Sequence, residues 1–242
     1  MELSIIIPVY NERDTVLELL DRVRAVEIRR DIIIVDNCST DGTREIVQGL
    51  SFPDVRAIFQ PANLQKGNSV KRGIAEARGD FLVVQDADLE YDPQDHVAML
   101  AEARREDVLA VFGSRVLGAS LRGETVPRTA FSFGRETITS LFRLLYGSRL
   151  TDIATCYKMM RTDVARTLDL QCNGFDLDFE IVCKLTRLAA RRGQRIAEVP
   201  IHYMPRTVEE GKKITWRDGL TSLAAIWRYR SWQPHEAGGK AP

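Results

Sequence analysis

"LSIIIPVYNE", residues 3–12, changes from an apolar run to a polar cluster within ten residues. The apolar part predicts a buried strand, and the polar part begins where that strand ends. The same change recurs where "DIIIVD" (31–36) precedes "NCSTDGT", and again in "FLVVQDADLE" (81–90). Continuous apolar strands are typical of a parallel sheet covered on both faces, which binds ligands at the carboxyl ends of its strands. The sequence therefore predicts a site at that edge.

The segments between the apolar runs have the spacing of amphipathic helices, so strands and helices alternate along the chain. We expect a single α/β domain with a Rossmann-like, mostly parallel central sheet and helices on both faces. Residues 113–123 are rich in glycine and are expected to be irregular. The predicted strands are 3–9, 31–36, 55–59, 80–86, 107–113, 153–160 and 198–203. Three helices are predicted to begin near Asp14, Thr43 and Pro93. Three more are predicted over 67–78, about 130–146 and about 177–192.

Composition excludes several classes of protein. The 242 residues, 44% of them hydrophobic, suffice for one large core, and 34 Lys and Arg balance 34 Asp and Glu. A net charge of zero argues against a nucleic-acid partner. The charge is uneven, since residues 184–230 hold eleven Lys and Arg against four acids, an excess of seven. The four cysteines lack metal-binding spacing and indicate free thiols in a reducing cytosol.

The acids of "QDADLEYDPQD" form the densest charge cluster in the chain. Asp86 and Asp88 alternate at the end of a predicted buried strand, with Glu90 two residues further on. Carboxylates this close repel one another unless a positive group lies among them. Mg²⁺ and Mn²⁺ prefer oxygen ligands that they share with substrate phosphates. The parallel topology would bring Asn11 and Asp36 to the same crevice, which favours a metal site over a solvated loop.

Taken together, these motifs resemble a known family. "SIIIPVYNE", "IIIVDNCSTDGT", "NLQKGNSVKRGIAEARGDFLVVQDADLE" and "GSRVLG", in this order, resemble an inverting glycosyltransferase of family 2 with the GT-A fold. "TDIATCYKMMR", "GFDLDFEI" and "VPIHYMPRTVEEGKKITWRDG" are most similar to the second half of the dolichyl- and polyprenyl-phosphate sugar synthases. The resemblance covers about residues 3–219. It implies a GT-A domain over 1–219, followed by an amphipathic helix and short tail over 220–242.

The resemblance implies roles for particular residues on the donor side. Asp86 and Asp88 would hold Mg²⁺ or Mn²⁺ on the donor diphosphate, together with Glu90. Lys66 and the helix start at Gly67 would lie near the donor, where a cation and backbone N–H groups suit phosphate. The residues implied to lie beside the nucleotide sugar are Pro8, Tyr10, Glu12, Asp36, Asn37, Lys66, Gly67, Asp86 and Ala87.

Asn37 departs from the family pattern, because many relatives have a second acid at this position. An amide offers both a donor and an acceptor where a carboxylate only accepts, so the base of the donor stays open between uracil and guanine.

On the acceptor side, the resemblance implies a phosphate site made by basic residues. Arg115 and Arg128 would be the principal ones, and both would act in catalysis by positioning the acceptor. Ser132 would accompany them, and a basic loop would close over the site. The loop residues are Arg206, Lys212 and Lys213.

The implied reaction moves a sugar from a nucleotide-sugar donor to polyprenyl phosphate with inversion at the anomeric carbon. A phosphate monoester is already ionised near neutral pH, so it needs no general base. Two alternatives remain open: the same donor chemistry with a hydroxyl acceptor on a lipid or glycan, and a nucleotidyltransferase or silent nucleotide-sugar-binding module. Nucleotidyltransferases of similar topology carry a Gly-rich loop after the first strand, where this chain has "PVYNERDT".

Several of these residues also have a purely structural interpretation. Asp36 could cap the following turn, Tyr10 could pack in the core, and Arg115 could pair with a nearby acid. Glu180 and Lys184 have the spacing of an ion pair on a solvated helix face.

We expect a cytoplasmic protein that lies peripherally on the cytoplasmic face of the membrane. No signal peptide and no apolar stretch of membrane-spanning length is present in the sequence. Aromatic, apolar and basic residues at 130–147 and 220–232 suit interfacial helices, although core packing explains the same pattern. The resemblance leaves a homo-oligomer or a separate membrane partner open.

Overall fold

The computed structural model describes residues 1–124, 130–206 and 216–234, without the side chains of residues 130–133, 216 and 217. Arg128, Lys212 and Lys213 lie outside the described residues, as does the side chain of Ser132. The strands are β1 (Leu3–Val9), β2 (Arg30–Asp36), β3 (Val55–Phe59), β4 (Phe81–Val84), β5 (Val108–Ser114), β6 (Lys158–Arg161) and β7 (Arg195–Pro200). The helices are α1 (Val16–Arg24), α2 (Thr43–Gln48), α3 (Lys66–Glu76), α4 (Asp95–Ala103), α5 (Arg115–Leu121), α6 (Ala130–Tyr146), α7 (Thr162–Thr167), α8 (Leu177–Arg192) and α9 (Trp216–Arg228).

The strands form one sheet of seven, in the order β3-β2-β1-β4-β6-β5-β7. β6 pairs antiparallel with both β4 and β5, and the other pairings are parallel. The fold is therefore the α/β architecture with a mostly parallel sheet that the sequence predicts. From β1 the chain builds outward through β2 to β3 and then returns to β4 on the other side of β1. This reversal leaves a crevice at the carboxyl ends of β1 and β4, which is where open α/β sheets bind ligands.

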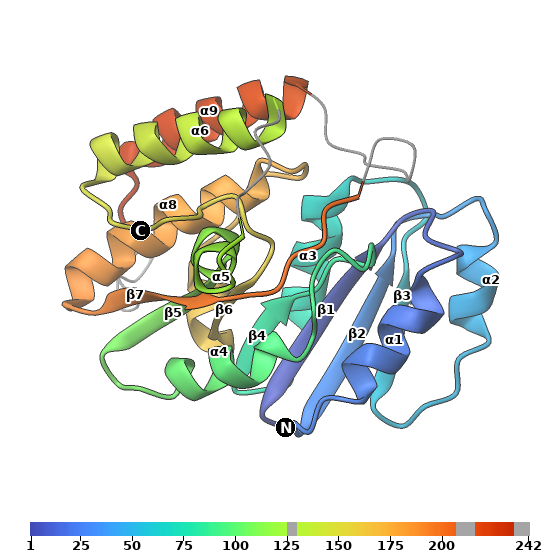
Figure 1. The fold of residues 1–242 in the computed structure, drawn as a ribbon. Helices are drawn as coiled ribbons and strands as arrows, with labels where there is room; N and C mark the ends of the chain where they lie inside the picture. Colours follow the sequence, from blue (N-terminus) through green and yellow to red (C-terminus); the bar gives the residue numbers. More distant parts are fainter. Residues whose placement is uncertain (125–129, 207–215, 235–242) are drawn as a thin grey trace, which may run out of the picture.

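Helices cover the sheet, and α6, α8 and α9 lie together beside its β5–β7 half (Figure 1). β1 and β2 are buried along nearly their whole length, which fits the run of Ile and Val at the centre of each strand. A Cβ added at Gly118 in α5 would clash with the backbone of Ile201, just after β7. The absence of a side chain there lets α5 hold the segment after β7 against the sheet edge, which leads that segment to the site.

Several predicted boundaries are corrected by the structure. The strand predicted at 153–160 is a loop until Lys158, and residues 115–121 form a helix in place of an irregular stretch. Helix α7 was not predicted. The predicted domain boundary at 219 falls inside α9. These differences all lie after residue 114, in the part of the chain that inserts strand β6 between β4 and β5.

Helix α9 and the turn after it pack on α8, with Ile226 and Tyr229 buried. Beneath them, Lys184 lies 2.6 Å from Glu180, and both side chains are 1% exposed or less. The predicted ion pair between Glu180 and Lys184 is confirmed. The expectation that the pair lies on a solvated helix face was wrong, because the C-terminal segment covers both side chains. In the part of the chain that the structure describes, no helix is long and apolar enough to cross a bilayer.

Candidate active site

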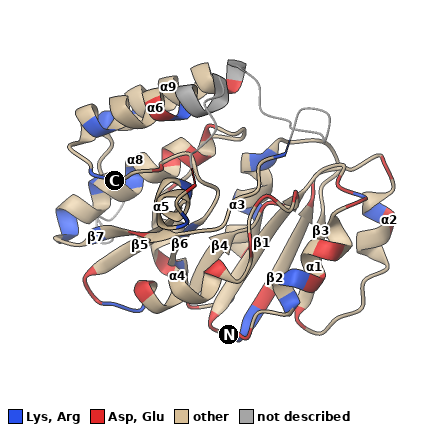
Figure 2. Ribbon diagram, viewed as in Figure 1, with Lys and Arg blue, Asp and Glu red and all other residues tan. Residues whose placement is uncertain are grey.

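The loops after β1 and β4 carry the densest acidic groups at the sheet edge (Figure 2). Residues with a strained backbone conformation are concentrated at this same edge. Among the described residues, five that are not glycine have positive φ, and four of them lie in the loops after β1, β2, β3 and β4. Left-handed backbone in such residues costs energy and is most frequent at functional sites. The four are Asn11, Cys38, Gln65 and Leu89.

Lys66 is a positive group that the protein itself places among these acids. It begins α3, and its Nζ lies 2.6 Å from one oxygen of Asp86 and 2.9 Å from the other. Burial would lower the pKa of Lys66, but the charge of Asp86 outweighs burial and raises it well above its usual value. Asp86 and Lys66 therefore neutralise each other within the protein.

Asp88 has no such partner among the described side chains. One of its oxygens accepts a bond from the backbone N–H of Glu90 at 3.1 Å. Burial, followed by the charges of Asp86 and Glu90, raises the pKa of Asp88 to about 7. A carboxylate with a pKa raised by burial and like charge is stabilised by an added cation.

The donor set at this edge suits a hard divalent cation. Asp88 and Glu90 offer oxygen ligands, as Mg²⁺ and Mn²⁺ prefer, whereas Asp86 is already paired with Lys66. Among the described residues, no three His, Cys, Asp or Glu side chains are grouped to hold a metal without help. A cation here would take one or two protein ligands and complete its shell with phosphate oxygens and water, the usual arrangement for Mg²⁺.

Two cross-links bring the segment after β7 to this edge. The guanidinium of Arg206 lies 3.1 Å from Glu12 in the loop after β1, and its Nε donates to the Asp88 carbonyl at 2.5 Å. Glu90 accepts the Tyr203 hydroxyl at 2.8 Å and the backbone N–H of Arg206 at 2.7 Å. Residues 203–206 are thus held against the loops of both strands that form the crevice.

Asp36 and Asn37, at the end of β2, are engaged inside the protein. The Asp36 carboxylate is fully buried and lies 2.9 Å from Arg44. Asn37 donates to Asn63 and accepts from the backbone N–H of Leu64, both at 2.8 Å. Both groups of the Asn37 amide therefore fix the loop after β3, and contact of either residue with a base stays a prediction.

The remaining donor-side residues lie around the same crevice. Pro8 and Tyr10 are half-buried and Ala87 is buried. A Cβ at Gly67 would lie 2.7 Å from the Asn173 backbone, so this glycine allows the start of α3 to approach the loop before α8.

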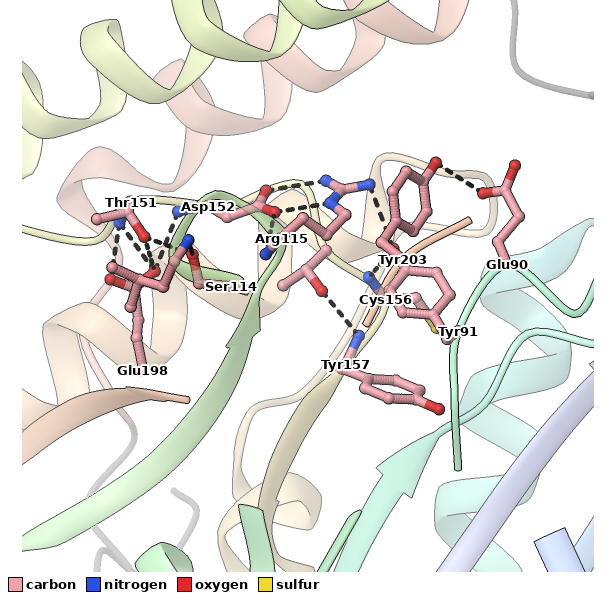
Figure 3. A network of polar contacts seen from close by, with 12 residues as sticks. Glu90, Tyr91, Ser114, Arg115, Thr151, Asp152, Cys156, Tyr157, Glu198 and Tyr203 are labelled. Carbon is pink, nitrogen blue, oxygen red and sulfur yellow. Dashed lines mark hydrogen bonds and ion pairs between the residues drawn. The ribbon is translucent and has the colours of Figure 1, made fainter. Parts of the chain in front are cut away.

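A second polar network surrounds Arg115 (Figure 3). Its Nε and Nη2 donate to the two oxygens of Asp152 at 2.6 and 2.8 Å. Glu198 in turn accepts the backbone N–H groups of Thr151 and Asp152. The pKa of Asp152 is lowered, because the charge of Arg115 outweighs burial. Arg115 thus makes the structural pair that the sequence left open, and its Nη1 points to the Tyr91 hydroxyl at 3.3 Å.

Sequence reasoning missed Tyr203, Lys158 and Asp178. Asp178 lies 3.1 Å from Lys158 and 3.9 Å from Lys66, so it belongs to the charge network of the crevice. Its place in "GFDLDFEI", at the start of a predicted helix, was a signal for it. No sequence signal pointed to Tyr203 or Lys158, because their partners lie 113 and 20 residues away along the chain.

The sequence of the chain matches a known protein family over most of its length. The model described as "Glycosyl transferase family 2" matches residues 4–169, and the chain belongs to this family. It is 31% identical to "Undecaprenyl-phosphate mannosyltransferase" of Micrococcus luteus, over 88% of the chain and 87% of that protein. It is 29% identical to "Dolichol-phosphate mannosyltransferase" of Pyrococcus furiosus, over 96% of the chain and 65% of that protein.

Solved structures agree on the fold. The chain is similar to glucosyl-3-phosphoglycerate synthase from Mycobacterium tuberculosis in complex with Mn²⁺, UDP and phosphoglyceric acid, with a TM-score of 0.69 at 17% identity. This likeness covers 98% of the chain and 80% of that structure. The sequence prediction of a family 2 glycosyltransferase with the GT-A fold is therefore confirmed.

Proposed function

We propose that this protein transfers a sugar from a UDP- or GDP-sugar to a polyprenyl or dolichyl phosphate, with inversion at the anomeric carbon. Relatives over most of the chain bear the names of undecaprenyl- and dolichol-phosphate mannosyltransferases, which supports this acceptor. The observation that carries the donor half of the proposal is the unmatched carboxylate of Asp88 at the topological switch point.

On the donor side, we assign Asp88 and Glu90 to a Mg²⁺ or Mn²⁺ ion that the donor diphosphate would share. When bound, the cation offsets the negative charge that develops on the leaving diphosphate. Lys66, at the start of α3, keeps Asp86 in place. Backbone N–H groups at that helix start suit phosphate as well. We place the nucleotide along Pro8, Tyr10, Glu12 and the loop after β2.

Asp178 bears on the choice of acceptor. It is the described carboxylate nearest Lys66 after Asp86, and it lies between the ammonium groups of Lys66 and Lys158. Both compete with an incoming hydroxyl for its oxygens. An acceptor that is already ionised needs no base. This favours a lipid phosphate over an alcohol.

We assign the acceptor phosphate to the basic residues that the family resemblance implies. They are Arg115, Arg128, Ser132, Arg206, Lys212 and Lys213. Arg115 would contribute only the N–H groups of Nη1 and Nη2 that are left over, because Asp152 accepts from Nε and Nη2 and the Tyr91 hydroxyl accepts from Nη1. Its principal role in the described structure is therefore to shape the site, and the charge for the phosphate would come mainly from the other residues.

The proposal includes a peripheral contact with the cytoplasmic face of a membrane. Leu144 on α6 is 81% exposed, and Leu220 and Trp227 on α9 are 56% and 58% exposed. These two helices lie side by side (Figure 1), and we assign their exposed apolar side chains to the membrane contact. Apolar side chains flanked by arginines suit the boundary between lipid head groups and acyl chains.

The activity is tested by incubating the purified protein with a panel of UDP- and GDP-sugars and polyprenyl phosphate. Polyprenol, the same lipid without phosphate, serves as the matched acceptor control. We expect product only with the phosphate, loss of product in EDTA, and recovery with Mn²⁺ or Mg²⁺. Equal transfer to polyprenol would contradict the proposed acceptor, and full activity in EDTA would contradict the metal.

Membrane contact is tested by flotation with anionic vesicles that contain polyprenyl phosphate. We expect Leu144→Glu and Trp227→Glu to shift the protein toward the unbound fraction. Leu17→Glu is the control, because Leu17 is 48% exposed on α1, away from α6 and α9 (Figure 1). Equal loss of binding in all three variants would contradict a contact through α6 and α9.

A further inference from the structure

Tyr203 connects the two polar networks of the protein (Figure 3). Its hydroxyl donates to Glu90 at 2.8 Å, and the centre of its ring lies 4.9 Å from the guanidinium carbon of Arg115. Tyr91 packs against the same ring at 5.3 Å between centroids. The ring is therefore held between Arg115 and Tyr91, which directs its hydroxyl toward the crevice.

Arg115 is itself immobilised. Asp152 binds it through two hydrogen bonds and is completely buried, and the Arg115 side chain is 11% exposed. Paired hydrogen bonds between a guanidinium and a carboxylate fix the orientation of both groups as well as their distance. The contacts thus run from a rigid buried pair through the ring of Tyr203 to Glu90.

The Tyr203 hydroxyl is the donor in its bond to Glu90, because a carboxylate oxygen accepts. Glu90 accepts the Tyr203 hydroxyl on one oxygen and the Arg206 backbone N–H on the other. An ionised carboxylate has about four acceptor positions, so both oxygens keep a lone pair for a further ligand.

We infer that Tyr203 is a positioning residue, which orients the carboxylate of Glu90 beside Asp88 so that the two can bind one divalent cation. The inference rests on the proposed function, because it assigns Tyr203 a part in the cation site proposed there. Hydrogen bonds to ligating side chains fix their direction, and their loss lowers metal affinity about 10- to 100-fold.

The test measures binding of Mn²⁺ alone, by electron paramagnetic resonance of the free ion, without any turnover. Tyr203→Phe keeps the ring and removes only the hydroxyl, and we expect the Kd for Mn²⁺ to rise about tenfold. The matched control is Tyr157→Phe. Tyr157 belongs to the same aromatic cluster, 4.7 Å from Tyr91, but its hydroxyl donates to Gln85. We expect the control to lower thermal stability while leaving Mn²⁺ affinity unchanged.

A double-mutant cycle with Glu90→Gln identifies the route of the effect. If Tyr203 acts through Glu90, Tyr203→Phe changes Mn²⁺ affinity much less in the Glu90→Gln background. Equal effects in both backgrounds, or a Kd unchanged in Tyr203→Phe, would overturn the inference. Asp88→Asn separates this from the proposed function. If Asp88→Asn abolishes Mn²⁺ binding and Tyr203→Phe leaves it intact, only the role of Tyr203 fails. If Asp88→Asn has no effect, the cation site itself fails.

Discussion

The crevice at the ends of β1 and β4 and the network around Arg115 lie close together, yet they treat charge in opposite ways. In the crevice, Lys66 matches Asp86 but leaves Asp88 unmatched, and the pKa of Asp88 rises to about 7. In the second network, Asp152 and Arg115 match each other completely, and the pKa of Asp152 falls. The first arrangement suits the proposed cation, and the second fixes the positions of its side chains. The difference between the two regions is therefore whether the protein itself supplies the partner of each buried carboxylate.

The largest expected effect is on activity and comes from the unmatched carboxylate. Asp88→Ala removes the principal ligand of the proposed cation, and we expect transfer to fall about a thousandfold or more, since a bound cation contributes several kcal/mol to the transition state. Steady-state transfer with a fixed donor and acceptor measures it. Asp21→Asn, at an exposed position on α1, is the control. Retention of more than a tenth of the activity in Asp88→Ala would place the cation elsewhere.

The matched network is expected to determine stability. Asp152→Ala leaves Arg115 buried without its partner, which should lower the free energy of unfolding by about 3–5 kcal/mol. Urea unfolding measures it. Asp163→Ala is the matched control, because Asp163 also pairs with an arginine, Arg161, but on the surface with 69% and 57% exposure. We expect it to cost less than about 1 kcal/mol. Similar losses in both variants would remove the distinction between the two regions.

Removing the charge of Asp88 should have the opposite effect on the free energy of unfolding, measured in the same way. The folded pKa of Asp88, about 7, lies above the ordinary value of 3.8, so ionised Asp88 destabilises the fold at pH 8. Asp88→Asn, measured in chelator, should raise the free energy of unfolding on the order of 1–3 kcal/mol at pH 8. The gain should vanish near pH 4, where Asp88 is protonated in the folded state. A destabilised Asp88→Asn at pH 8 would show that Asp88 supports the fold.

The smallest expected effect concerns His96, which packs 4.9 Å from Tyr157 below the crevice. Burial lowers the pKa of His96 to about 3, from an ordinary value of 6.5. The unfolded chain therefore binds a proton that the folded protein excludes. Below pH 6.5 this lowers the free energy of unfolding by up to about 1.4 kcal/mol per pH unit. We expect a shallower decline between pH 6.5 and 5 in His96→Gln, and an identical slope in both proteins would contradict the assignment.

The sequence alone determined the fold class and the edge of the sheet where the acidic loops of the candidate site meet. Continuous apolar runs at 3–9 and 31–36 predict buried parallel strands, and the acids that follow 81–84 mark the carboxyl edge. Such predictions succeed because periodicity and strand ends are local properties of the chain. The spacing of Glu180 and Lys184 was equally local, and their ion pair formed as predicted.

Only the tertiary structure decided which charges meet and which are buried. Lys66 and Asp86 are 20 residues apart, Arg115 and Asp152 are 37 apart, and Glu90 and Tyr203 are 113 apart. Each contact forms because the order of strands in the sheet brings distant loops to one edge, and no local pattern records that order. Burial follows the same rule: Glu180 and Lys184 are buried because residues 168–172 and the C-terminal segment both pack against them. The sequence specifies the chemical groups. Packing between distant segments determines which groups become partners, and therefore how the pKa of each group is shifted.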